Sequence, residues 1–292
     1  MTPPIVSSPA VTLDARLTPA RPDLAARHLE GVVTAERFAD GVPHRVIRPT
    51  VPVRGTPDPT AALVTEALFG ETVTVYETDS EGWVWGQLDA DSYVGWLPAE
   101  ALAPAGPAPT HKVVALRTPV FPGPSIKLPP DALLSFGSRL CMTGARERFA
   151  VTADGGFVFA AHLAPLDAFE DDFVAVAARF LGAAYLWGGR SSLGLDCSGL
   201  VQVALNACGI PCPRDTDMQE TALGTPVSFS GEPIDARRGD LLYWPGHVGI
   251  VEDGATLLHA TAHFMCVVRE PLAEALSRIE ASGTALRSVR RL

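Results

Sequence analysis

The feature that most constrains the fold of this chain is a glycine-rich stretch at residues 185–200, Tyr-Leu-Trp-Gly-Gly-Arg-Ser-Ser-Leu-Gly-Leu-Asp-Cys-Ser-Gly-Leu. The residues after Cys197 are apolar at helical spacing, and Asp196 with Ser198 can cap the start of a helix. The sequence therefore predicts a thiol at a helix N-terminus. The macrodipole and the unpaired N–H groups there should lower the thiol pKa and favour the reactive thiolate.

Composition excludes several classes of protein. The chain has 292 residues and is 47% hydrophobic, which is enough for two or three units with cores of their own. Its net charge of −10 provides no basic surface, so we expect neither a nucleic-acid partner nor a membrane partner. The odd number of cysteines, 5, fits reduced thiols better than a disulfide framework. Cys208 and Cys212 lack the second ligand pair of a zinc site, so no metal is expected.

The start of the chain bears on its location. It reads Met-Thr-Pro-Pro-Ile-Val-Ser-Ser-Pro-Ala and has neither the basic segment nor the apolar segment of a signal peptide. No run of residues approaches the roughly 18 apolar residues that a membrane span needs. We therefore expect a cytoplasmic protein with no signal peptide and no transmembrane segment.

The residue pattern divides the chain into an arm and three units. Residues 1–45 form the arm, in which residues 21–30 predict a short helix with proline near its start. Residues 46–104 contain short alternating strands between turn residues, a pattern typical of a small β-barrel. A proline-rich linker follows, and residues 110–167 repeat the same strand rhythm.

The last unit, residues 168–292, combines a helix with a predicted antiparallel sheet. An amphipathic helix is predicted at residues 171–181, just before the glycine-rich stretch. Apolar strands are predicted at residues 240–244 and 247–251, and the next one follows an Asp-Gly turn. The pattern indicates an α+β fold.

Two histidines on the predicted sheet can complete a nucleophile site. A catalytic thiol needs a base within hydrogen-bond reach, and the base needs a third group that fixes its orientation. His247 opens one strand and His259 lies on the next, so their side chains should be close together. Either residue taken alone is better explained by a structural alternative, with Cys197 as an inert buried thiol and His247 as a satisfied core histidine.

Taken as an ordered set, these segments resemble the NlpC family of cell-wall cysteine peptidases over residues 168–292. The matching segments are Asp-Cys-Ser-Gly-Leu at 196–200, Gly-His-Val-Gly-Ile-Val at 246–251 and Leu-His-Ala at 258–260. The resemblance implies a papain-like domain with helices packed on an antiparallel sheet. In such a domain Cys197 is the nucleophile, His247 is the general base and acid, and His259 orients His247. Tyr185 matches the family tyrosine near the oxyanion site.

The first strand-rich block resembles a bacterial SH3-like domain. The resemblance rests on Leu-Phe-Gly-Glu at 68–71, Gly-Trp-Val-Trp at 82–85 and Tyr-Val-Gly-Trp-Leu-Pro at 93–98. The second block is interpreted as a more divergent SH3-like barrel. The whole chain is therefore predicted to be α+β, with two small SH3-like β-barrels followed by a papain-like cysteine peptidase domain.

Two such barrels in front of the peptidase domain, without a signal peptide, resemble a subgroup that recycles cell-wall peptides in the cytoplasm. Its members are γ-D-glutamyl-L-diamino acid dipeptidyl peptidases, which require a free N-terminal L-alanine. The resemblance implies a murein-derived peptide substrate, release of L-Ala-γ-D-Glu and no cofactor. Three alternatives stay open, namely an endopeptidase of the exported wall, an amidase, and a catalytically inactive peptide-binding protein. The sequence does not distinguish lysine from diaminopimelate in the leaving position.

A free amine implies an acidic, closed end of the cleft. The candidate substrate-binding residues are Glu71, Tyr93, Tyr185, Trp187, Asp196, Ser198, Arg214, Asp215 and Thr216. Most are assigned by resemblance, but Asp196 and Ser198 are included because they flank the nucleophile, and Trp187 is either a cleft wall or core packing. Glu71 and Tyr93 are assigned to the amine, and Arg214 is a candidate for the D-glutamate α-carboxylate because a guanidinium fork matches a carboxylate. Each has a structural alternative: Glu71 can be a solvated charge, Tyr93 a core aromatic and Asp215 a helix cap.

Overall fold

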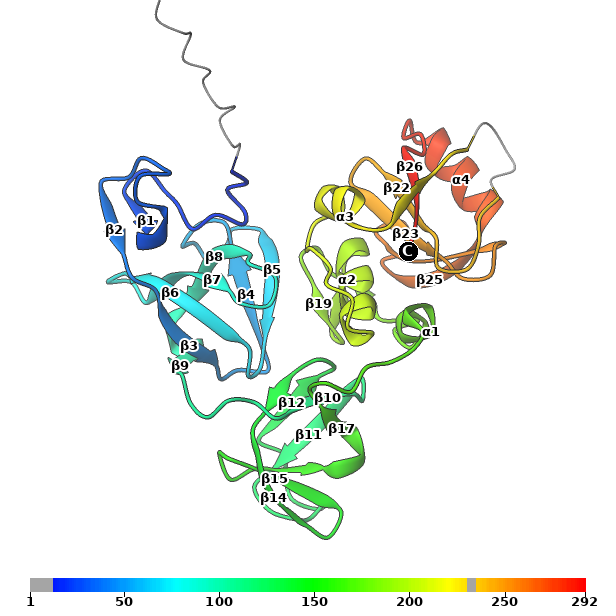
Figure 1. Cartoon of the computed structure of the whole chain (residues 1–292). Helices are drawn as coiled ribbons and strands as arrows, with labels where there is room; N and C mark the ends of the chain where they lie inside the picture. The colour runs from blue at the N-terminus through cyan, green and yellow to red at the C-terminus, as the bar shows by residue number, and fades with distance from the viewer. Residues whose placement is uncertain (1–12, 230–234) are drawn as a thin grey trace, which may run out of the picture.

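The computed structural model describes residues 13–229 and 235–292 and has three units (Figure 1). We call them the N-terminal unit (residues 13–104), the middle unit (110–167) and the C-terminal unit (168–292). The N-terminal and C-terminal units lie side by side, and the middle unit lies below both in this view. None of the helices in these residues is both long and apolar enough to cross a bilayer.

One seven-stranded sheet forms most of the N-terminal unit, in the order β5-β4-β8-β7-β6-β3-β9. Its strands are β3 (Val42–Val46), β4 (Thr50–Arg54), β5 (Leu63–Leu68), β6 (Thr72–Thr78), β7 (Trp83–Leu88), β8 (Val94–Pro98) and β9 (Leu102–Pro104), with the 3-10 helix η2 (Ala99–Ala101) before β9. Alternate residues such as Val51, Val53 and Leu97 point into one apolar core. The sheet begins at Val42, inside the segment that the sequence assigned to the arm.

The predicted helix at residues 21–30 is wrong. Strand β1 (Leu24–Ala26) pairs in parallel with β2 (Arg37–Ala39), and only η1 (Arg27–Leu29) forms a single 3-10 turn. All three β1 residues are completely buried. Consecutive residues of an extended chain face opposite sides, so burying all three favours a covered strand over an amphipathic helix with one buried face.

The middle unit has two small sheets around a compact core. The three-stranded sheet contains β10 (His111–Val113), β13 (Arg139–Leu140) and β17 (Leu163–Pro165). The five-stranded sheet contains β11 (Arg117–Phe121), β12 (Ala132–Ser135), β14 (Met142–Arg146), β15 (Phe149–Thr152) and β16 (Phe157–Phe159), and η3 (Ala160–His162) precedes β17. That this unit is a second SH3-like barrel stays a prediction.

The C-terminal unit has helices on both faces of a nine-stranded sheet. The helices are α1 (Phe173–Ala178), α2 (Cys197–Ala207), α3 (Thr216–Ala222) and α4 (Leu272–Ala281). The strands are β18 (Ala184–Tyr185), β19 (Arg190–Ser191), β20 (Gly194–Leu195), β21 (Thr225–Val227), β22 (Leu241–Trp244), β23 (His247–Val251), β24 (Thr256–Thr261), β25 (Cys266–Pro271) and β26 (Ser288–Arg291). The central strands β22 to β25 are antiparallel. Strand β22 shows why both faces are covered, since Leu241 and Tyr243 pack with α1 and α2 whereas Leu242 and Trp244 pack with α4.

A buried ion pair joins the N-terminal and C-terminal units. Arg190 of β19 pairs with Glu71, and its Nε donates to the Glu66 backbone oxygen at 2.6 Å. The Arg190 backbone N–H also donates to the Glu66 carboxylate at 2.9 Å. The side chains of Arg190 and Glu71 are both 5% exposed. These contacts hold the edge of the N-terminal sheet against the glycine-rich stretch.

Replacing Glu71 by Gln should destabilise the protein, because Arg190 would stay buried without its counter-charge. Breaking a buried pair on one side costs about 3 kcal/mol or more of the free energy of unfolding. Asp40→Asn is the matched control, since Asp40 is 75% exposed in its pair with Arg27 and such surface pairs contribute at most about 1 kcal/mol. Chemical denaturation of both variants measures the difference. Equal losses in the two variants would contradict a stabilising role for the Arg190 pair.

Candidate active site

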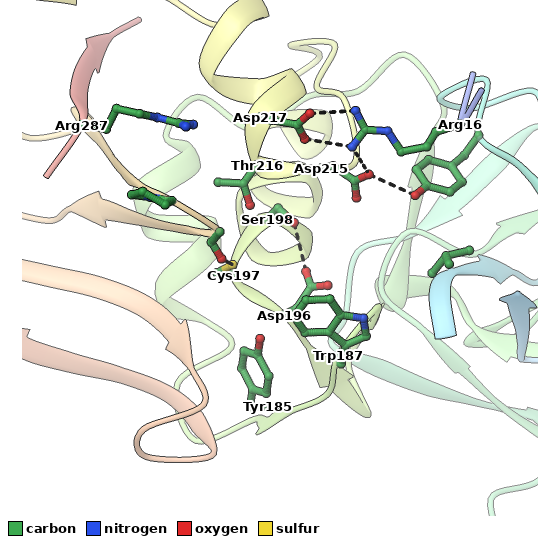
Figure 2. A pocket seen from close by; sticks show the side chains of 14 residues that line it. Arg16, Tyr185, Trp187, Asp196, Cys197, Ser198, Asp215, Thr216, Asp217 and Arg287 are labelled. Atoms are coloured by element: carbon green, nitrogen blue, oxygen red, sulfur yellow. Dashed lines mark hydrogen bonds and ion pairs between the residues drawn. The ribbon is translucent and has the colours of Figure 1, made fainter. Parts of the chain in front are cut away.

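A cavity of about 470 Å³ lies between the N-terminal and C-terminal units, with Cys197 in its lining. Figure 2 shows its side chains. Eight of the candidate residues from the sequence line it: Tyr93, Tyr185, Trp187, Asp196, Cys197, Ser198, Asp215 and Thr216. The sequence missed six others, namely Arg16, Val64, Asp217, Pro245, Gly246 and Arg287.

The predicted thiol at a helix N-terminus is confirmed. Helix α2 begins at Cys197, and the Asp196 carboxylate caps it by accepting a hydrogen bond from the Gly199 N–H at 2.7 Å. Gly199 is required here because a Cβ atom would lie 2.2 Å from the Gly189 backbone oxygen. The glycines of this stretch thus let the loop pack directly against the first turn of α2. Cys197 Sγ points toward the Gly246 backbone oxygen, 3.9 Å away.

The expected thiolate is wrong for the resting protein. Burial, and then the negative charge of Asp196, raise the pKa of the Cys197 thiol to about 11. Cys197 is only 6% exposed. Hydrogen bonds from the Val248 N–H, the Thr216 hydroxyl and the Ser198 N–H act in the opposite direction but do not outweigh these two effects. Desolvation therefore exceeds the helix-terminus effect on which the sequence argument relied.

The two histidines lie together, as their neighbouring strands predict. His247 opens β23 and His259 lies on β24, and His247 Nε2 is 2.9 Å from His259 Nδ1. Burial lowers the pKa of His247 to about 3, helped by the neighbouring His259, and lowers the pKa of His259 to about 4. Both imidazoles are therefore neutral at neutral pH. Neither imidazole lines the cavity, but the backbone on both sides of His247 contacts the Cys197 sulfur, at the Gly246 oxygen and the Val248 N–H. Among the described residues no hydrogen bond joins the thiol to the His247 ring.

A carboxylate that the sequence analysis missed extends this pair. His259 Nε2 lies 3.2 Å from Oε2 of Glu270, although the two atoms do not form a hydrogen bond of standard geometry. Arg278 holds Glu270 through two bonds of 2.8 and 2.6 Å. A carboxylate at this place favours the proton on His259 Nε2, so that His259 Nδ1 accepts from His247 Nε2–H. The Nδ1 atom of His247 is then the unprotonated nitrogen.

Glu270 could have been found from the strand pattern. In the antiparallel register His259 faces Val268, and Glu270 is two residues further along β25 on the same face of the sheet. The sequence could therefore have indicated Glu270 as a carboxylate on the strand face that also carries a candidate catalytic histidine.

An acidic cluster surrounds one guanidinium at the end of the cavity formed by the N-terminal unit. The Tyr93 hydroxyl donates to Asp215 Oδ2 at 3.0 Å, and Arg16 Nη1 donates to the same oxygen at 2.9 Å. Arg16 also pairs with Asp14 and Asp217, each at 2.7 Å. Burial raises the pKa of Asp215, whereas Tyr93, Arg214 and Arg16 act to lower it. We call this group, Asp14, Asp215 and Asp217 around Arg16, the acidic end.

Asp215 occupies the N-cap position of α3, yet its side chain makes no capping hydrogen bond. Its carboxylate instead contacts Tyr93 and Arg16, so the structural alternative of a helix cap does not account for it. Arg16 could not be found from local pattern, because it meets Asp215 across 199 residues of sequence.

The predicted role of Arg214 in binding a substrate carboxylate is wrong. Its side chain is 1% exposed and does not line the cavity. The guanidinium holds both oxygens of Asp196, at 2.9 and 2.7 Å, together with the Ser198 hydroxyl at 2.9 Å. Its Nε donates to Thr65 Oγ1 of the N-terminal unit at 2.9 Å. Its donors are thus occupied by groups that shape the site.

The assignment of Glu71 to the substrate amine is also wrong. Glu71 does not line the cavity, and its carboxylate is paired with Arg190 and accepts from the Leu68 N–H at 2.8 Å. Its partner lies in the interface between the units, so the carboxylate points away from the substrate space.

Two aromatic residues complete the lining near the thiol. Trp187 is 66% exposed and forms an open side of the cavity. Tyr185 lies below Cys197 in Figure 2, with its hydroxyl toward the thiol. Burial raises the pKa of Tyr185, and the negative charge of Asp196 adds to this effect, so its hydroxyl keeps its proton and can donate.

Comparison with known proteins agrees with this architecture. Residues 53–102 match the bacterial dipeptidyl-peptidase SH3 domain, and residues 182–277 match the NlpC/P60 family. A gamma-D-glutamyl-L-lysine dipeptidyl-peptidase of Bacillus subtilis is 30% identical over 221 residues, which cover 68% of this chain and 72% of the relative. A protein of the same name from Bacillus cereus is 27% identical over 209 residues, covering 62% of this chain and 60% of the relative.

A solved structure supports the fold. The crystal structure of an NlpC/P60 family protein from Bacillus cereus superposes with a TM-score of 0.71. The superposition covers 85% of this chain and 99% of that chain, at 20% sequence identity. The shared arrangement therefore extends beyond the C-terminal unit.

The raised thiol pKa predicts how Cys197 reacts with iodoacetamide. Because only the thiolate reacts, the alkylation rate should rise about tenfold per pH unit between pH 7 and 9, with no plateau. Fragmentation mass spectrometry assigns the label to Cys197, because Cys208 and Cys212 lie with it on the segment between Arg190 and Arg214. Cys197→Ser provides the blank. A plateau already present at pH 7 would show a standing thiolate–imidazolium pair and contradict the prediction.

Proposed function

The chain belongs to the NlpC/P60 family of cysteine peptidases, and we propose that it hydrolyses murein peptides between γ-D-glutamate and an L-diamino acid. The product would be L-Ala-γ-D-Glu. The observation that carries this proposal is the acidic end, since its Arg16, Asp215 and Asp217 line the same cavity as Cys197. The names of the relatives from Bacillus subtilis and Bacillus cereus support it.

The acidic end suits a peptide amine. Three carboxylates surround a single guanidinium there, so the cluster has a net negative charge. Asp215 Oδ2 is occupied by Tyr93 and Arg16, whereas Oδ1 has no hydrogen-bond partner among the described residues. A substrate ammonium bound at Oδ1 fixes the start of the peptide. With the amine fixed there, the bond that follows the second residue of the peptide lies at the thiol. Cleavage of that bond releases a dipeptide.

The proposed reaction begins with transfer of the Cys197 proton to His247 Nδ1. Sulfur attacks the carbonyl carbon of the D-glutamate γ-amide, and the Cys197 backbone N–H and the Tyr185 hydroxyl donate to the developing oxyanion. His247 returns the proton to the leaving nitrogen as the C–N bond breaks, which leaves a thioester. Water then attacks with His247 as the base, the C–S bond breaks, and the thiol recovers its proton. Because the pKa of the Cys197 thiol is raised, its proton moves to His247 at the same time as the sulfur attacks the carbonyl carbon.

His259 and Glu270 act through His247 in this scheme. Their chain of contacts, braced by Arg278, directs the Nε2–H of His247 away from the substrate. The opposite ring nitrogen is thereby left free for the thiol proton. His259 is thus a positioning residue, as its resemblance to the family implies.

Recognition of a free amine favours released peptides over intact wall. In intact murein the alanine nitrogen is part of an amide and carries no charge, so it cannot pair with Asp215. We therefore place the protein in recycling of cell-wall peptides in the cytoplasm. Cleavage of intact wall in preference to free peptide would instead identify a wall endopeptidase.

Cys197→Ala should abolish release of L-Ala-γ-D-Glu from L-Ala-γ-D-Glu-diaminopimelate or the lysine peptide. Loss of the nucleophile lowers kcat by about 10³-fold or more. Cys208→Ala is the matched control, since Cys208 lies at the far end of α2 and outside the cavity, and it should retain full activity. Chromatography of the products measures both variants. Equal rates for wild type and Cys197→Ala would remove Cys197 from the reaction.

Acetylation of the substrate N-terminus should lower kcat/KM sharply by removing the charge that pairs with Asp215. We expect Asp215→Asn to lower kcat/KM for the free peptide by about 10- to 100-fold, mainly through KM, as for the loss of one charged hydrogen bond. The variant should discriminate less between free and acetylated peptides. Cleavage of the acetylated peptide by wild type at the rate of the free peptide would exclude an amine site.

A further inference from the structure

Arg287 lines the cavity at the end opposite the acidic end. Figure 2 shows Arg287 and Arg16 at opposite sides, with Cys197 and Thr216 between them. Arg287 immediately precedes β26, and its side chain is 46% exposed. No pattern in the sequence indicated a role for Arg287.

The Arg287 side chain is held in place with its outer edge unused. Its Nε donates to Glu220 Oε1 at 3.1 Å, and Nη2 pairs with Glu220 Oε2. The Arg287 backbone N–H donates to the Tyr243 backbone oxygen at 2.8 Å, so the residue is anchored at both its backbone and its side chain. Within the described residues Nη1 has no partner, and Nη2 has a second hydrogen. The edge formed by Nη1 and Nη2 is therefore available for a carboxylate.

The direction of the bound peptide brings its leaving group toward the Nη1 and Nη2 edge of Arg287. Under the proposed function the substrate amine lies at Asp215 and the scissile carbonyl at Cys197. The residue beyond the scissile bond then extends past Pro245 and Gly246, toward Arg287. This residue is the diamino acid.

We propose that Arg287 binds a carboxylate of the leaving diamino acid through Nη1 and Nη2. Two carboxylates are chemically suitable: the α-carboxylate at the end of a tripeptide, and the side-chain carboxylate of diaminopimelate. Lysine carries an ammonium group and no carboxylate on its side chain, so a guanidinium there disfavours it. Glu220 offsets part of the Arg287 charge. Asp217, the acid of α3 that lines the cavity, is paired with Arg16.

Four substrates distinguish the two carboxylates: L-Ala-γ-D-Glu-diaminopimelate, L-Ala-γ-D-Glu-L-Lys, and the α-amide of each. Arg287→Gln should lower kcat/KM by about 10- to 100-fold for peptides that present the recognised carboxylate, mainly through KM. A loss confined to both diaminopimelate peptides identifies the side-chain carboxylate. A loss confined to both free acids identifies the α-carboxylate. Arg287→Lys keeps the charge without the fork and should retain part of the preference.

Arg269→Gln is the matched control. Arg269 forms the same kind of fork with Glu252, at 2.5 and 2.7 Å, is 48% exposed and lies outside the cavity. The Arg269→Gln variant should have the same kcat/KM as the wild type for each of the four substrates. Unchanged ratios among the four substrates in Arg287→Gln would overturn the proposal while leaving the peptidase activity established. Failure of the wild type to cleave any of the four would instead refute the proposed function, and this inference with it.

Discussion

The buried pair of Arg214 and Asp196 is the interaction on which the site depends. Asp196 caps the helix that carries Cys197 and accepts a hydrogen bond from the Gly188 N–H at 2.9 Å, so it ties the glycine-rich loop to α2. Arg214 neutralises this carboxylate and reaches Thr65 in the N-terminal unit. The thiol and the interface between the units are thus positioned by one network. Burying two charges is costly, and only the many hydrogen bonds around the pair make it tolerable.

The cavity is organised by charge along its length. One end is negative, the lining between the two ends includes the neutral Cys197 thiol, and the far end carries the Arg287 guanidinium. A peptide with an ammonium at its start and a carboxylate beyond the scissile bond matches this order. Its orientation then follows from charge, while the chemistry takes place in the desolvated centre, where hydrogen bonds to an oxyanion are strongest.

Short-range patterns predicted the parts of the site that depend on secondary structure. The cysteine at the start of α2 followed from the cap and helical spacing, and the contact of His247 with His259 followed from their neighbouring strands. The charged residues were harder to predict. Glu71 and Arg214 have the right chemistry for a substrate but are buried with protein partners, whereas Arg16 and Arg287 reach the cavity without any local signal. The role of a charged side chain depends on which group it pairs with. For these residues that group lies far away in the sequence, so a local pattern does not reveal it.

The sequence by itself determined the strand-rich first half, the nucleophile helix and the histidine pair, because capping and the periods of helix and strand act over a few residues. The tertiary structure alone decided the state of the thiol, since burial raises its pKa where the helix terminus would lower it. It alone placed residues 24–26 in a strand, which is stabilised by being covered on both sides. It also brought Arg16 and Tyr93 to Asp215 at the acidic end. These contacts join residues more than a hundred positions apart, and only packing of the units brings them together.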